Sequence, residues 1–282
     1  MIPFSKAHAC GNDFLIVPED AAQSAAEGSL AALARRLCSR TTGIGADGVE
    51  FFSWIPESPA NHPGSASRSG RVRLHNADGS PAEISGNGTR CVAAWMADAL
   101  DAQPGDSFTV ITGAGPRVCQ INARSGQSVD VTTGMSVPRF APHTLKLIDG
   151  ADVVGVEVSI GNPHLVVLVD NTDFSFAHRS WTSLGEEICI HRDFPHQANA
   201  EFVRVVDDHE IEIRIFERGV GPTSSSGTGT CAAATAVLAL RRCLSPVTVV
   251  APGGPQTVAW SGPGTELFLT GPAALIARGE TW

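Results

Sequence analysis

The chain carries one short motif twice: Ser85-Gly86-Asn87-Gly88 in its first half and Ser226-Gly227-Thr228-Gly229 in its second. Each motif opens an alanine-rich stretch, which favours a helix. A polar turn precedes each motif at the same spacing, Asn76-Ala77-Asp78-Gly79 or Glu217-Arg218-Gly219-Val220. Unpaired N–H groups and the helix dipole both favour negative charge at a helix start. Two such helix N-termini facing each other would therefore make a focused anion site.

Composition excludes several classes of protein. The 282 residues are 43% hydrophobic and 17% charged, which is typical of a globular protein. The net charge of −9 and the lack of long basic runs argue against a nucleic-acid surface. No apolar run reaches the roughly 20 residues that span a bilayer. The N-terminal residues lack a signal-peptide pattern, so we expect a cytoplasmic protein without a membrane partner.

Cysteine and histidine spacing gives no metal or disulfide pattern. The seven cysteines are odd in number and form no C-x-x-C pair, so a disulfide framework or zinc ribbon is not expected. We expect most of these thiols to be buried as small hydrophobic groups. The nine histidines include no H-E-x-x-H, and we expect no protein-bound catalytic metal.

The repeat extends beyond the glycine-rich motifs. Gly11-Asn12-Asp13 is echoed by Gly161-Asn162-Pro163, and the elements follow in the same order in both halves. This order suggests duplicated domains with a cleft between them. We expect domains at 1–130 and 131–271, with a C-terminal strand at about 272–282 returning to the first. One long helix per half among many strands predicts an α+β fold, with each helix wrapped by a mixed, mostly antiparallel sheet.

Local patterns place the elements. Helices are predicted at 87–100, at 228–242, and from a cap at Ser29 to Cys38. The stretch Pro56–Gly70 is rich in proline, serine and glycine, and is interpreted as an exposed insertion. Apolar runs predict strands at Phe14–Val17, Val49–Trp54, Arg71–His75, Ser107–Ile111, Val118–Ile121, Val153–Ile160, Leu165–Val169, Phe202–Val206, Glu210–Phe216, Val247–Val250 and Leu267–Leu269.

Seven segments in order give a resemblance to a known family. They are His8–Phe14, Thr42–Gly48, Asn76–Glu83, Ser85–Cys91, Gly161–His164, Asn199–Phe202 and Glu217–Ala232. On these segments the chain resembles the diaminopimelate epimerases, which interconvert LL- and meso-diaminopimelate in lysine and cell-wall precursor synthesis. The resemblance implies two similar domains with the active site between them, no pyridoxal phosphate or other cofactor, and a homodimer.

The chain departs from the family at its two reacting positions. The family has a cysteine before each Gly-x-Gly, one to remove the α-proton and one to return a proton to the other face. Here Ser85 and Ser226 occupy both positions, and Cys91 and Cys231 lie too far into the helices to replace them. A thiol ionises readily at a helix N-terminus, whereas serine needs an adjacent base. Ser85 and Ser226 are therefore candidates for helix capping, for lining the site, or for acid–base catalysis.

Further site residues follow from the resemblance. His164 and Glu217 are the best candidates for a base or for binding the α-ammonium group, although His164 could equally be a turn residue bonded to backbone. Arg218 is suited to holding a carboxylate with two parallel bonds. The other family positions that contact ligand are Asn12, Asn76, Asn162 and Asn199, with the backbone N–H groups of Gly86, Asn87, Gly227 and Thr228. Each asparagine alone would be interpreted as an Asx-turn residue.

Four interpretations stay open. The chain is a working epimerase of the diaminopimelate class that uses serine hydroxyls; a racemase or isomerase of another amino acid; a silent homologue that binds an amino acid without turnover; or an engineered Cys→Ser variant. Sequence alone does not separate them, although Thr223-Ser224-Ser225 before Ser226 favours native drift in a serine-rich stretch.

Overall fold

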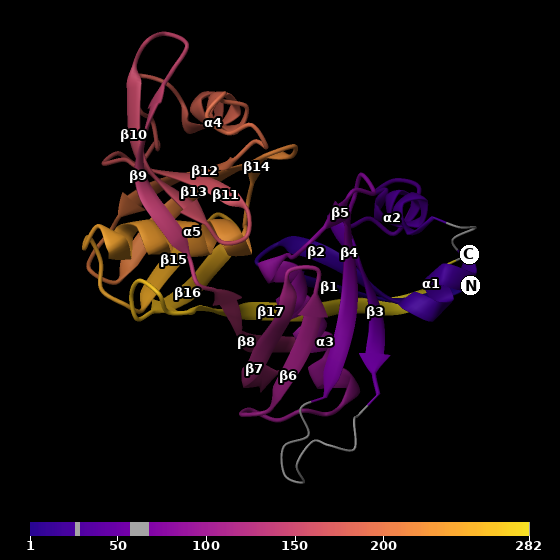
Figure 1. Ribbon diagram of the computed structural model, residues 1–282. Helices are drawn as coiled ribbons and strands as arrows, with labels where there is room; N and C mark the ends of the chain where they lie inside the picture. Colours follow the sequence, from indigo (N-terminus) through magenta and orange to yellow (C-terminus); the bar gives the residue numbers. More distant parts are fainter. Residues whose placement is uncertain (26–28, 57–67, 282) are drawn as a thin grey trace. The chain divides into compact units, whose positions relative to one another are not determined.

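The computed structural model describes residues 1–25, 29–56 and 68–281. The chain falls into two compact units (Figure 1): an N-terminal unit, Met1–Thr133 with Gly271–Trp282, and a C-terminal unit, Gly134–Thr270. Most of the predicted insertion Pro56–Gly70 lies outside the described residues.

The N-terminal unit is a mixed sheet around one long helix. Parallel pairs join β2 to β3 and β4 to β6, whereas β1–β2, β1–β17, β3–β4, β4–β5, β6–β7 and β7–β8 are antiparallel. Its helices are α1 (Glu19–Ala25), α2 (Leu30–Cys38) and α3 (Gly86–Ala99). Its strands are β1 (Ile2–Ala9), β2 (Asn12–Pro18), β3 (Gly48–Ile55), β4 (Ser69–Asn76), β5 (Pro81–Ala82), β6 (Ser107–Thr112), β7 (Gly115–Ser125) and β8 (Ser128–Ser136).

The C-terminal unit repeats this plan. Parallel pairs join β11 to β12 and β13 to β15, in the same order along the chain as β2–β3 and β4–β6. Its helices are α4 (Trp181–Cys189) and α5 (Gly227–Ala239). Its strands are β9 (Arg139–Lys146), β10 (Asp152–Ser159), β11 (Pro163–Leu168), β12 (Asn199–Val205), β13 (Glu210–Glu217), β14 (Gly221–Thr223), β15 (Val247–Ala251) and β16 (Gly254–Trp260).

Each unit buries its long helix among its strands. Helix α3 contacts β1, β2, β6 and β7, and α5 contacts β10 to β13, β15 and β16 (Figure 1). The alanines of both helices are fully buried except Ala99 and Ala239 at the helix ends, and α5 is buried on every side because its residues from Gly227 to Val237 are small or apolar. The small side chains let the strands approach closely. The predicted α+β fold of two similar halves, each a helix wrapped by a sheet, is confirmed.

Most elements lie where the sequence predicts them. Each predicted strand overlaps an observed one, and α2 begins after the predicted Ser29 cap. The second long helix ends at Ala239, so its predicted end at Arg242 is wrong by three residues. The sequence patterns missed β1, β5, β8, β9, β14, β16 and helices α1 and α4.

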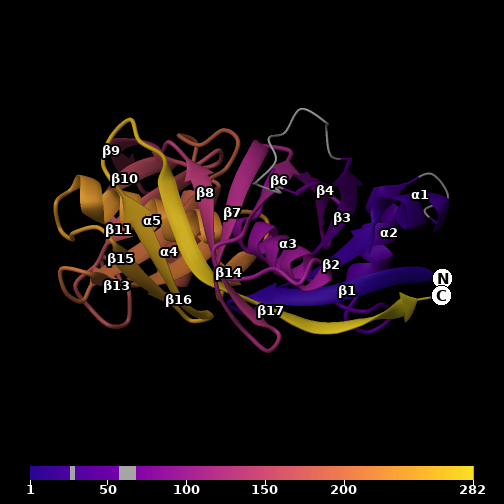
Figure 2. The same ribbon diagram turned by 90° about the horizontal axis from the view of Figure 1, so that it is seen from below.

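The last strand belongs to both units. Strand β17 (Leu267–Thr281) is much longer than the predicted Leu267–Leu269. Its residues 267–270 pair with β16 in the C-terminal unit, and residues 274–281 pair with β1 in the N-terminal unit. Figure 2 shows β17 running beside β1 to the two chain ends.

Candidate active-site motifs

Both motif serines are N-caps of the long helices. Ser85 has extended backbone angles (φ −126°, ψ 124°), and the Gly88 N–H donates to its Oγ over 3.0 Å. Ser226 is the same (φ −144°, ψ 127°), with the Gly229 N–H donating to its Oγ over 3.3 Å. Helix capping is therefore one role of these serines, since an N-cap side chain satisfies one otherwise unpaired N–H.

A buried glutamate lies against the start of α3. Glu50 is the middle residue of the apolar run Val49-Glu50-Phe51 on β3, and only 1% of it is exposed. A Cβ atom on Gly88 would overlap its Oε1 and would lie 3.2 Å from the Ser85 Cβ. Only glycine therefore fits here, and Glu50, Gly88 and Ser85 form one packed group.

Glu50 has no hydrogen-bond partner for its second carboxyl oxygen. Within the described part of the chain, Oε2 is buried and unpaired. Burial raises the pKa of Glu50 to about 8, because the charged form is poorly solvated there. The group is therefore largely a neutral acid at neutral pH.

The C-terminal unit places a glutamate in the same position. Glu201 on β12 is fully buried. A Cβ atom on Gly229 would lie 2.8 Å from Glu201 Oε1 and 3.3 Å from Ser226 Oγ. Glu201 pairs across the parallel strands with Val166, as Glu50 pairs with Ile16. The two glutamates are thus equivalent in the repeat.

The two glutamates differ in their partners. Glu201 Oε1 lies 2.8 Å from Nδ1 of His164, which is fully buried, and His164 Nε2 lies 3.0 Å from Asn162 Oδ1. The residue of the N-terminal unit that corresponds to His164 in strand register is Phe14. Glu201 therefore has a histidine partner, whereas an apolar ring occupies the equivalent place beside Glu50.

Bonds between loops hold the start of α3. Asn87 Nδ2 donates to Asn12 Oδ1 over 3.1 Å, and Asn12 Nδ2 donates to Asp47 over 2.7 Å. Arg40 then bridges Asp47 and Asp13, each at 2.8 Å. Asn12 is thus a long-range bridge and not the local Asx-turn residue that its neighbours suggest.

Asp13 is the charged centre of this network. Burial alone would raise the pKa of Asp13, but hydrogen bonds and charge from Arg40 and Lys6 lower it to about 2. Lys6 Nζ lies 2.9 Å from its carboxylate. The carboxylate is therefore ionised at any neutral pH and holds the loop before β3.

The remaining predicted contacts also stabilise loops. Asn199 Oδ1 accepts the Arg218 backbone N–H (3.0 Å), and the exposed Arg218 guanidinium donates to the His196 carbonyl (3.0 Å). Asn76 donates to Ser80 Oγ over 3.0 Å within its turn. Glu217 lies directly before Arg218 at the end of β13 and is partly buried.

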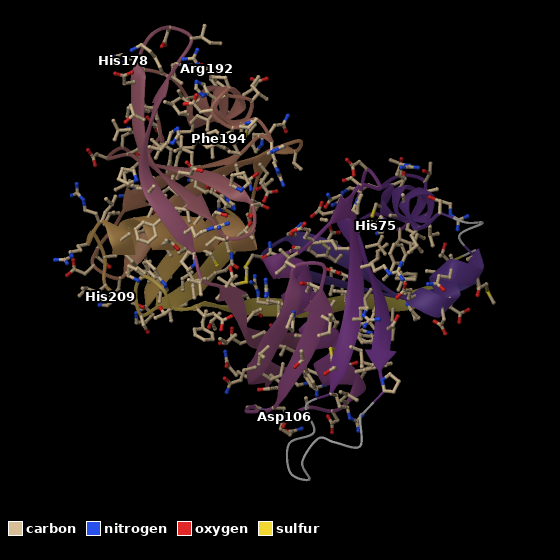
Figure 3. The ribbon with its side chains drawn as sticks, in the orientation of Figure 1. His75, Asp106, His178, Arg192, Phe194 and His209 are labelled. Atoms are coloured by element: carbon tan, nitrogen blue, oxygen red, sulfur yellow. The ribbon has the colours of Figure 1, made fainter. Side chains whose placement is uncertain are left out.

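The structure brings the predicted residues together within each unit. In the N-terminal unit Ser85, Gly86, Asn87 and Asn12 meet at the start of α3; in the C-terminal unit His164 and Asn162 are bonded, as are Asn199 and Arg218. Asn76 lies in the neighbouring turn. The ring of His75, just before it, packs edge-on against Phe51 at 5.4 Å in the N-terminal unit (Figure 3).

Sequence reasoning missed Glu50 and Glu201 as site residues. Each is an acidic residue with an apolar neighbour on either side in its strand, which is the signal that a buried and functional carboxyl leaves in a sequence. Their equivalence becomes visible only in the strand register.

The cysteines are buried, as predicted, and all seven are free thiols. Cys91 and Cys231 are fully buried inside α3 and α5. Burial raises the pKa of the Cys91 thiol far above its ordinary range. Cys91 is therefore no substitute for a thiolate at the start of α3. Among residues 1–25, 29–56 and 68–281, no cluster of three histidine, cysteine or carboxylate residues is arranged to hold a metal.

Comparison with known proteins gives a family match over most of the chain. The family described as diaminopimelate epimerase matches residues 4–138 and 156–276. A diaminopimelate epimerase of Pseudomonas aeruginosa is 35% identical over 294 residues, covering 99% of each chain. One from Synechocystis is 33% identical over 290 residues, covering 99% of this chain and 98% of the relative.

A solved structure supports the fold. The structure of a predicted epimerase from Pseudomonas aeruginosa superposes with a TM-score of 0.72 at 14% identity, covering 100% of this chain and 99% of the other. No helix in the described residues is long and apolar enough to cross a membrane.

Proposed function

Because the chain belongs to the diaminopimelate epimerase family, we propose that it interconverts LL- and meso-diaminopimelate by α-proton exchange without a cofactor. Such an isomerase acts in lysine and cell-wall precursor synthesis. We also propose that it works in the cytoplasm as a homodimer, as the family resemblance implies.

One observation carries the proposal: the same capped helix start occurs once in each unit, and the family resemblance assigns the two reacting positions to these caps. An epimerase needs two acid–base positions, one to remove the α-proton and one to return a proton. Ser85 and Ser226 occupy these positions in the proposal. The N–H groups of Gly86, Asn87, Gly227 and Thr228 are the proposed binding site for the carboxylate of the reacting centre, because helix starts favour anions.

The other predicted residues take supporting roles in the proposal. His164 and Glu217 orient the reacting centre or receive its α-ammonium group. Arg218 holds a ligand carboxylate, for which its exposed guanidinium is available at the cost of one bond to a backbone carbonyl. Asn162 positions His164 and Asn199 positions the Arg218 backbone, whereas Asn12 and Asn76 hold the loops near the start of α3 and are proposed to contact the ligand.

Deuterium incorporation tests the proposal. The protein is incubated with LL- or meso-diaminopimelate in D₂O, and exchange at the α-carbon and its stereochemistry are followed by NMR. We expect exchange with inversion from either isomer. Binding of both isomers without any exchange would refute catalysis while leaving the binding site intact.

A second candidate is a homologue that binds the amino acid without turnover. The serine hydroxyls accept cap hydrogen bonds, as such a homologue would allow, but the family match and the named relatives do not favour this alternative. The same NMR experiment separates the two candidates, because a binding protein shifts ligand signals without exchanging the α-proton. If other amino acids exchange and diaminopimelate does not, the enzyme is instead a racemase of a different substrate.

A further inference from the structure

Ser85 by itself is a poor base for an α-proton. A serine hydroxyl gives up its proton only when an adjacent group receives it. The strongest candidate in the described N-terminal unit is Glu50, because its carboxyl and Ser85 both pack against Gly88. No motif of the sequence assigns a function to this residue.

Burying the Glu50 carboxyl destabilises the fold, which indicates that the residue is kept for a function. A buried polar atom without a hydrogen bond destabilises the fold, and Oε2 of Glu50 is such an atom among the described residues. An apolar residue would fill the position between Ile16 and Leu74, its neighbours across the sheet, without that penalty. A buried, poorly paired titratable group beside a catalytic position is typical of a functional residue.

We propose that Glu50 is a positioning residue that exchanges a proton with Ser85 and so makes the serine hydroxyl competent in α-proton transfer. The inference rests on the proposed function. When the α-C–H bond breaks, its proton moves to Ser85 Oγ and the electron pair stays on the α-carbon. The original hydroxyl proton of Ser85 moves to the ionised form of Glu50, which is the minor form at neutral pH, and Glu50 becomes a carboxylic acid. With the opposite isomer as substrate the same transfers run in reverse: Ser85 Oγ gives its proton to the α-carbon and the Glu50 carboxylic acid gives its proton to Ser85, so no other reactant is needed.

The repeat supports this assignment. The C-terminal unit places Glu201 against Gly229 and Ser226 in the same way, and His164 Nδ1 lies 2.8 Å from Oε1, the carboxyl oxygen that faces Gly229. Both motifs thus contain a serine, a glycine and a buried glutamate in contact. They differ in whether a histidine completes the group, so the two acid–base positions of the enzyme are chemically unequal.

The ionisable groups near this part of α3 are few. Arg90 and Cys91 follow on α3 itself, and Cys10 and Asp13 approach Cys91 from the β1–β2 region. Arg90 donates to Asn87 over 2.6 Å, and Asp13 is held by Lys6 and Arg40. Burial raises the pKa of Glu50 to about 8, so a profile of activity against pH can detect its titration.

The test compares Glu50→Gln with Glu50→Asp in the full-length protein. Glutamine keeps the size of the side chain and removes the titrating carboxyl, whereas aspartate keeps the carboxyl on a shorter chain. We expect Glu50→Gln to lower kcat for α-proton exchange by about 100-fold or more with little change in KM, and to remove the inflection near pH 8 from the kcat/KM profile. Glu50→Asp should retain more activity and keep the inflection.

A packing role predicts the reverse order, with glutamine better tolerated than aspartate, and that result overturns the inference. So does an unchanged pH profile in Glu50→Gln. Glu19→Gln is the matched control: Glu19 is also buried in the N-terminal unit but is bonded to Ser53 and Arg73. It should leave the profile unchanged.

A second readout separates this inference from the proposed function. The carboxyl carbon of Glu50, assigned by its loss in Glu50→Gln, is titrated by ¹³C NMR in the wild type and in Ser85→Ala. A shift in the titration midpoint between the two proteins shows the coupling without any turnover. Identical titrations refute the inference even if the enzyme is active, and a wild type that exchanges no α-proton refutes the proposed function.

Discussion

Glu50→Gln should stabilise the protein, and the gain should grow with pH. The pKa of Glu50 rises from 4.5 to about 8 on folding, because burial penalises the carboxylate. Between these values the folded protein keeps a proton that the unfolded chain has lost, so wild-type stability falls as pH rises. The stability that the protonated Glu50 carboxyl contributes is fully present below pH 4.5 and is lost as the pH rises through about 8. Glutamine cannot ionise and avoids this loss.

The size of the effect follows from the shift. Roughly three and a half pKa units at about 1.4 kcal/mol each give about 5 kcal/mol as the largest difference, reached near pH 8. Below pH 4.5 the two proteins should be about equally stable, since a protonated carboxyl and an amide are similar in size and polarity.

Chemical denaturation of both proteins across this pH range measures the difference. The transition midpoint of Glu50→Gln should move away from that of the wild type steadily as pH rises, with an unchanged slope. Glu19→Gln is the control, because it breaks the ion pair with Arg73 and should not gain stability. A difference between wild type and Glu50→Gln that is independent of pH, or a variant less stable than wild type at pH 8, refutes the reasoning.

Three further changes test other parts of the structure. Ser85→Cys combined with Ser226→Cys should raise α-proton exchange by about 100-fold or more, because helix N-termini favour thiolates; NMR exchange rates no higher than those of the parent argue against the serines occupying the acid–base positions. Asp13→Asn should lower the free energy of unfolding by about 2 kcal/mol at pH 7, because Arg40 and Lys6 lower the pKa of Asp13 and so stabilise its carboxylate in the folded protein. The wild type loses this stability as pH falls from about 4 through about 2, whereas the variant has none to lose; parallel acid-unfolding curves for the two proteins would contradict this. Gly88→Ala should lower the free energy of unfolding by about 1–3 kcal/mol, since the new Cβ overlaps Glu50. In a Glu50→Ala background the overlap is gone and the loss should be smaller; losses that simply add in the double variant would show that the two residues do not touch.

Local patterns in the sequence were enough to predict the starts of α2, α3 and α5 and most strands. Ser85 and Ser226 precede glycine and small residues, and both cap long helices as that chemistry requires. Helix α4 was missed because Trp181–Cys189 is a short, mixed segment after an irregular stretch. Strand β1 was missed because polar residues at Ser5, Lys6 and His8 interrupt its apolar pattern.

The glutamates could not be placed from the sequence. Val49-Glu50-Phe51-Phe52 is apolar on both faces of β3, so periodicity does not say which helix Glu50 meets. Its neighbour Phe51 packs in the core beside α2, while Phe52 lies in the core around α3. Only the strand register reveals that Glu50 reaches Gly88 and that Phe14 stands where the other unit has His164.

Strand β17 also affects how the chain is made. Residues 274–281 pair with β1 from Ile2 to His8, so the sheet of the N-terminal unit is completed only after these residues have been synthesised. Until then one edge of β1 is exposed. Ribosome-bound chains that stop before residue 271 should therefore remain open to protease at β1. The same pairing brings Ile2 opposite Thr281, so a short linker could join these ends and new termini could be opened in a surface loop. In such a permutant β17 would be made directly before β1, and the sheet could close as a local hairpin.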